Sequence, residues 1–138
     1  MTAQASGDSG ERVLHPDLSA AERRRLHERA VALFDRGRFF EAHEPWEEIW
    51  RSTSPEPRDL WQGLVQIAAG FHHWFDRGRA APAARLLRRG LRRLSTFDVV
   101  EAGVDLDRSR ATIEQWIGWL ESGARGPAPP RPRLYRRR

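Results

Sequence analysis

The chain has 138 residues, of which 39% are hydrophobic, so it is long enough for one domain with an apolar core and too short for two. It contains no cysteine, which excludes disulfides, a thiol nucleophile and any cysteine-ligated metal centre. The formal net charge is +5, but six of the 24 arginines follow residue 124, so residues 1–124 hold 18 arginines against 19 acidic residues.

The first 16 residues are small and polar, and they contain no apolar run typical of a signal peptide. No stretch of the chain approaches the roughly 20 apolar residues that a membrane-spanning helix needs. Together with the absence of cysteine, this pattern predicts a cytoplasmic protein without a membrane partner. We expect residues 1–16 to form a disordered N-terminal segment.

Two helices are predicted in the first half of the chain. Ser19 followed by Glu22 is a capping box, and it opens a helix that stops near Gly37. A second helix runs from about Phe39 to Arg51 and is followed by a turn at 52–57. The first helix presents one apolar face: Leu26, Ala30, Leu33 and Phe34.

Three further helices follow. The third runs from about Asp59 to Arg77, with Gly78 as its stop, and Pro82 suits the first turn of the fourth. Asp105 or Asp107 can cap a fifth, which Gly123 ends. Because no window alternates with period two, the sequence predicts no strand. The expected fold is therefore an all-α, single-domain multihelical bundle of about five helices, over residues 17–124.

Residues 125–138 differ in composition from the bundle, because from Gly126 onward they are rich in proline and arginine. Such a segment has few apolar groups to offset the entropy lost on ordering. We therefore expect a disordered tail that does not pack.

Large aromatic residues surround a histidine and a glutamate on the second helix. At about 100° per residue, His43 and Glu47 lie inside the arc of four aromatic side chains, whereas the other acids do not. A charged pair on an apolar face costs free energy unless each group finds a partner. We therefore expect His43, Glu47 and Trp50 to be largely buried. The aromatic arc consists of Phe39, Phe40, Trp46 and Trp50, and Pro45 predicts either a kink there or a later helix start.

The third helix is apolar nearly all round, with one polar stripe formed by Gln62, Gln66 and His73. His72 lies to one side of that stripe. Gln66 and either His72 or His73 are the candidates to face His43 and Glu47. The alternative is that the stripe faces solvent.

Three blocks carry a family resemblance: FFEAHEPWEEIW, LWQGLVQIAAGFHHW, and a glycine followed by an Ala- and Leu-rich helix. Over about residues 33–97 the chain resembles the domain of unknown function 309 family. The family motif H-x-x-x-E-x-x-W is matched at His43, Glu47 and Trp50, and the pairs Glu41-Ala42 and Gln62-Gly63 also follow its pattern. The resemblance implies an all-helical fold and a suggested metal-binding role for the motif. It implies no established activity.

Three hypotheses concern the His43–Glu47 pair. The first is a divalent metal ion as cofactor, which would need at least one more ligand from His72, His73, Gln66 or Glu44. The second is metal-free acid–base chemistry, for which no nucleophile is evident, so enzymatic activity stays undecided. The third is a structural hydrogen-bonded pair that fixes how the second and third helices dock.

Two further hypotheses concern partners. The segment 131–138, with Tyr135 available for stacking, could contact the phosphates of a nucleic acid or an acidic partner, although we do not favour this hypothesis. The fifth helix carries Trp116 and Trp119, which would mark a homo-oligomer or partner surface if they were exposed.

Overall fold

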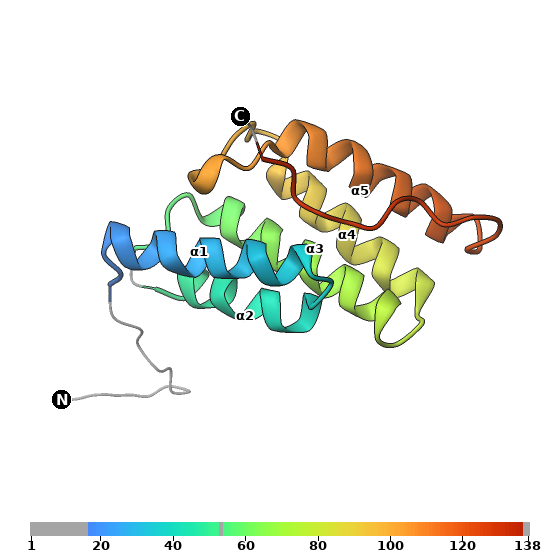
Figure 1. Ribbon diagram of the computed structural model, residues 1–138, viewed down its shortest axis with the longest axis horizontal. Coiled ribbons are helices and arrows are strands. Elements are labelled where there is room, and N and C mark those ends of the chain that lie inside the picture. The colour runs from blue at the N-terminus through green and yellow to red at the C-terminus, as the bar shows by residue number, and fades with distance from the viewer. Residues whose placement is uncertain (1–16, 53, 137–138) are drawn as a thin grey trace.

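The computed structural model describes residues 17–52 and 54–136, and over these residues it contains five α-helices and one 3-10 turn (Figure 1). The only β-type pairing within this part of the chain is two isolated bridges, Val99 with Asp105 and Val104 with Arg136. The predicted all-α, single-domain bundle is confirmed. The elements are α1 (Ala20–Asp35), α2 (Phe39–Trp50), α3 (Arg58–Phe75), α4 (Ala80–Leu94), η1 (Glu101–Gly103) and α5 (Leu106–Glu121).

Local side-chain chemistry sets the helix ends. The capping box at α1 is present in both directions, with Ser19 N–H donating to Glu22 at 2.8 Å and Glu22 N–H donating to the Ser19 hydroxyl at 3.0 Å. Gly37, at φ +80°, follows the end of α1, in a conformation that glycine adopts without strain. Of the two candidate caps for α5, the structure uses Asp105, whose carboxylate accepts from Arg108 N–H at 3.1 Å.

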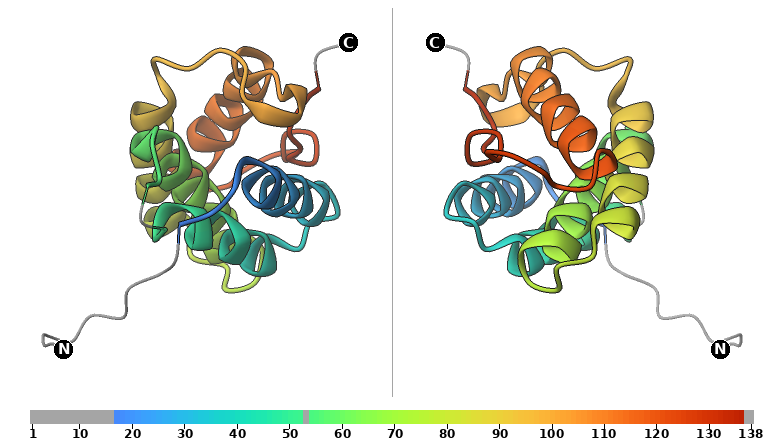
Figure 2. Two further views of the ribbon diagram at one scale, coloured as in Figure 1. Left: turned by 90° about the vertical axis from the view of Figure 1, so that its left-hand side faces the viewer. Right: turned by 90° about the vertical axis from the view of Figure 1, so that its right-hand side faces the viewer.

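Viewed along their long axis, the helices follow one another around the bundle in chain order (Figure 2). The closest packing is between α3 and α4, where glycines face each other. A Cβ added at Gly90 would lie 2.9 Å from the carbonyl oxygen of Gly63, so only glycine permits this approach of the two backbones. No helix in the described part of the chain is long and apolar enough to cross a membrane.

A row of aromatic side chains forms the core. Phe34 meets Phe39 edge-on at 4.9 Å between ring centroids, and Phe71 meets Trp116 of α5 in the same way at 5.8 Å. All four are nearly inaccessible to solvent. Such edge-to-face pairs add stabilisation beyond the burial of apolar area. Because Trp116 is buried in this core, it is not the exposed partner surface considered above.

The segment after α5 differs from the predicted disordered tail. Residues 126–136, here called the C-terminal strap, run along the bundle between α1 and α5 (Figures 1 and 2). Leu134 is 1% exposed, and its N–H donates to the Asp35 carboxylate at 2.8 Å. Tyr135 N–H donates to the Ser109 hydroxyl at 3.1 Å, and Trp116 donates to the Pro130 carbonyl at 2.9 Å.

The strap packs because α1 and α5 make little direct contact and leave a seam between them. Pro132 and Leu134 are buried, whereas Arg131 and Arg133 are exposed. This alternation lets a segment of polar composition bury two apolar side chains, and its backbone hydrogen bonds offset part of the ordering entropy. The predicted disordered segment 1–16 and the last two arginines of the tail lie outside the described residues.

Candidate functional site

His43 lies in the middle of α2, and both of its ring nitrogens face oxygen atoms. Nδ1 forms a hydrogen bond with the carbonyl oxygen of Phe40, one turn earlier. Nε2 lies 3.5 Å from Oε1 of Glu47, one turn later. Although Pro45 stands between them, α2 begins at Phe39 and continues through it, so the alternative of a helix that starts near Glu44 is wrong.

The pair is less buried than the sequence predicted. The side chains of His43 and Glu47 are 21% and 34% exposed, and Trp50 is half-buried. The buried face of α2 is centred on Ala42 and Ile49, about 100° around the helix from His43. The predicted burial was based on the aromatic residues alone and did not include these smaller apolar side chains. The motif therefore lies at the rim of the apolar face rather than at its centre.

Of the candidates on α3, the structure brings His72 close to this rim. The ring of Phe40 lies between the two imidazoles, with its centroid 4.9 Å from that of His43 and 5.0 Å from that of His72. Phe40 itself is 50% exposed. We call these residues, Phe40, His43, Glu47 and His72, the α2–α3 rim. Nδ1 of His72 also lies 2.5 Å from the Asp76 carboxylate, which holds the ring in place.

The remaining candidates are placed elsewhere or have different partners. Gln66 accepts a hydrogen bond from Arg93 of α4 at 3.2 Å, so its side chain is engaged away from α2. Gln62 is half-buried, whereas Glu44 is exposed. Nδ1 of His73 is buried and has no hydrogen-bond partner among the described residues. Burial lowers the pKa of His73, and the neighbouring His72, Arg77 and Arg79 lower it further.

Metal coordination by this set lacks a third ligand. Within residues 17–52 and 54–136, no group of three or more histidine, aspartate, glutamate or cysteine side chains is arranged to hold a metal ion. His43 and Glu47 could offer one nitrogen and one oxygen ligand, but catalytic zinc sites use three protein ligands. The arrangement alone therefore provides at most a two-ligand site that is open to solvent.

The carboxylates of α2 give its outer surface a negative character. The helix contains four glutamates and no arginine or lysine. Arg38 forms a bidentate pair with Glu41 at 2.5 and 2.9 Å, and Arg51 approaches Glu47 at 3.9 Å. Glu44 and Glu48 are exposed, and no ion pair to either is present in the described structure.

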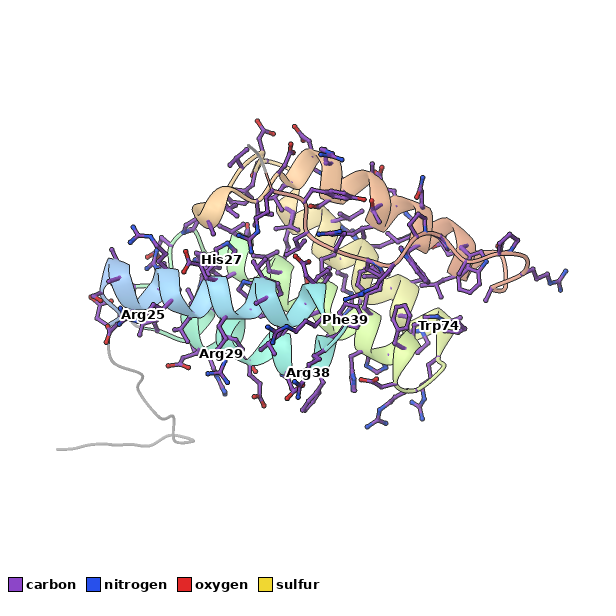
Figure 3. All side chains as sticks on the ribbon, in the orientation of Figure 1. Arg25, His27, Arg29, Arg38, Phe39 and Trp74 are labelled. Carbon is purple, nitrogen blue, oxygen red and sulfur yellow. The ribbon has the colours of Figure 1, made fainter. Side chains whose placement is uncertain are left out.

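One histidine of the core was not predicted from the sequence. His27 of α1 is completely buried, and its Nδ1 accepts a hydrogen bond from the indole N–H of Trp46 at 2.9 Å. Its ring also meets Trp61 edge-on at 5.4 Å. The signal was present, because His27 lies three, four and seven residues before Ala30, Val31 and Phe34 of the buried face. Figure 3 shows His27 on the side of α1 opposite Arg29.

The fold and the rim define a class of protein: a small helical bundle with a histidine–glutamate pair at the edge of an aromatic core. Residues 27–86 match the model of the family described as Domain of unknown function (DUF309). The matched interval begins at His27 and contains the whole α2–α3 rim.

Two curated relatives are themselves uncharacterised. The chain is 26% identical over 107 residues to an uncharacterized protein of Aquifex aeolicus, an alignment that covers 77% of this chain and 32% of the relative. It is 33% identical over 73 residues to the uncharacterized protein YpuF of Bacillus subtilis, covering 52% of this chain and 41% of the relative. The chain therefore spans less than half the length of either relative.

Proposed function

We propose that this protein is a binding module whose α2–α3 rim docks a positively charged segment of a partner protein. The observation that carries the proposal is Phe40, which is half exposed although it is held between the imidazoles of His43 and His72. Glu44 lies one helical turn from Phe40 and is available to a cationic side chain. An exposed aromatic ring beside carboxylates favours an arginine or lysine, through cation–π attraction and charge pairing.

A fluorescent arginine-rich peptide provides a direct test. We expect binding that Phe40→Ala weakens at least tenfold, because the contacted ring is lost. Since Phe40 is half exposed, the melting temperature should change little. The double variant Glu44→Gln/Glu48→Gln should also weaken binding, and the loss of affinity should be larger at low salt than at high salt. Val99→Ala, at another exposed apolar residue, is the matched control. Equal affinity of all variants would refute the docking site.

The orientation of His43 favours a second candidate function, the binding of a divalent cation by His43 and Glu47. If Nδ1 donates its proton to the Phe40 carbonyl, Nε2 presents its lone pair toward the Glu47 carboxylate. A lone pair and a carboxylate 3.5 Å apart repel each other unless a proton or a cation lies between them. Carbonyl contacts of this kind also orient metal-binding histidines in other proteins.

Titration with zinc alone distinguishes this second candidate from peptide docking. We expect weak binding, because only two protein ligands are present, and its loss in both His43→Ala and Glu47→Gln. His73→Ala should keep the affinity, since His73 is not part of the rim. Elemental analysis of protein purified without chelator measures any ion retained. Unchanged zinc affinity in His43→Ala would refute the metal site and leave the peptide result unaffected.

A further inference from the structure

Positive charge is strongly segregated within the bundle. Residues 77–97 contain seven arginines and no acidic residue, although residues 1–124 as a whole are nearly neutral. Five of the seven lie on α4: Arg85, Arg88, Arg89, Arg92 and Arg93. The positive charge of this protein is therefore not confined to its C-terminal end, as the overall count suggested.

The geometry of α4 places these arginines on its outer side. Its buried face packs on α3 and consists of Ala83, Ala84, Leu87, Gly90 and Leu94. At about 100° per residue, all five arginines fall within an arc of about 140° directly opposite that face. These five positions therefore lie on the side of α4 that faces away from α3.

Three of these arginines are free of the contacts that neutralise the others. Arg88 forms a bidentate pair with Glu121 at 2.6 and 2.7 Å, and Arg93 pairs with Asp59 at 2.9 Å. Arg85, Arg89 and Arg92 are exposed, and the described structure shows no ion pair to any of them. We call these three residues the α4 arginine stripe. At 1.5 Å per residue, the stripe extends about 10 Å along the helix.

An open groove continues the positive surface toward α5. It has a volume of about 530 Å³, and Arg88, Arg92, Ser95 and Arg110 are among its lining residues. Glu114 lines its α5 side, and Glu121 lies on the same helix. These two carboxylates bound the positive surface, so a long anionic ligand would follow α4 rather than cross α5.

The composition of this surface indicates the kind of partner. The large, clearly exposed apolar residues of the described chain are Phe40, Phe75 and Val99, and none of them lies on α4. A protein partner would find no exposed apolar centre on the stripe, whereas protein–protein interfaces have one. A phosphate backbone needs none, because guanidinium contacts and counterion release are sufficient for binding.

We propose that the α4 arginine stripe binds the phosphate backbone of nucleic acid without reading bases. This surface is distinct from the α2–α3 rim, because α3 lies between α2 and α4 (Figure 2). It is also distinct from the C-terminal strap, which lies against α1 and α5. The proposal does not depend on the proposed function of the rim.

The test compares full-length variants with equal charge change. Binding to labelled 20-base-pair duplex DNA and duplex RNA is measured by fluorescence anisotropy from 50 to 200 mM salt. The wild-type protein should bind both, and Arg85→Gln/Arg89→Gln/Arg92→Gln should weaken binding at 50 mM salt at least tenfold. For DNA, the slope of log affinity against log salt should become shallower by about 2.7, for three lost phosphate contacts.

The matched control is Arg24→Gln/Arg25→Gln/Arg29→Gln on α1, where all three arginines are exposed. This control should keep most of the affinity, and circular dichroism should show that both triple variants are folded. Equal losses in the two triple variants would overturn the proposal, because net charge alone would then explain binding. Absence of duplex binding at 50 mM salt would also overturn the proposal. Binding to phosphatidylserine vesicles, measured at the same salt concentration, without binding to either duplex would overturn it as well.

Discussion

Leu134→Ala tests whether the C-terminal strap is part of the folded domain. Leu134 is 1% exposed, and with Leu64 of α3, Leu94 of α4 and Ile113 of α5 it lines one apolar site in the core. Buried Leu→Ala changes cost about 2–5 kcal/mol through lost burial and the cavity that remains. Because a terminal segment can relax around the gap, we expect the lower half of that range, about 2–3 kcal/mol. For a domain of this size, that corresponds to a fall in melting temperature of about 6–15 °C.

Urea denaturation followed by circular dichroism measures this change, and Arg133→Ala is the matched control. Arg133 is adjacent in sequence but exposed, so its replacement should change the free energy of unfolding by less than about 0.5 kcal/mol. Deleting residues 126–138 should destabilise the protein at least as much as Leu134→Ala. Wild-type stability in both Leu134→Ala and the deletion would show that the strap does not dock in solution.

Further predictions concern residues inside the bundle. Gly90→Ala should lower the free energy of unfolding by about 1–3 kcal/mol, because the added Cβ would lie 2.7 Å from Ile67 and 2.9 Å from the Gly63 carbonyl oxygen. Gly118→Ala should raise it by about 0.5–1 kcal/mol, because a Cβ there would have no neighbour within 4 Å. Thermal melts of the two variants should shift in opposite directions. His27→Ala should lower the free energy of unfolding by about 3 kcal/mol or more, because it leaves a cavity and an unpaired buried indole N–H on Trp46, and a urea midpoint close to wild type would contradict this. Burial raises the pKa of the Asp35 carboxyl above its usual value of 3.8, so this carboxyl stays protonated to a higher pH in the folded protein than in the unfolded chain. The contribution of Asp35 to the free energy of unfolding therefore falls as the pH rises above about 4. Asp35→Asn, which keeps an oxygen for Leu134 N–H, should therefore gain stability relative to wild type between about pH 4 and pH 7, and parallel stability–pH curves would argue against this linkage.

Elements with local signals could be predicted, and those with long-range partners could not. The capping box at Ser19 and the glycines after α1 and α3 act within one helical turn, so the sequence alone placed these ends correctly within about two residues. The strap depends on a seam between α1 and α5, which no local composition reveals. The same difference applies to the site: the spacing of His43 and Glu47 identified the pair, but its exposure depended on how α2 rotates against α1 and α3. The arginines of α4 are visible in the sequence, but a net charge summed over residues 1–124 hides them, because acidic residues elsewhere, such as those of α2, cancel their charge.

The hydrogen bond from Leu134 to Asp35 joins residues 99 positions apart in the sequence, whereas the helices pack mainly on their neighbours along the chain. Contacts between sequence neighbours form early in folding, since little chain entropy is lost in closing short loops. The strap should therefore dock last, and the face of α1 that it covers should stay accessible until that step. In hydrogen exchange, the amides of Leu134 and Tyr135 should open with less free energy than those of α3, so local opening of this protein would begin at the strap while the helices remain folded.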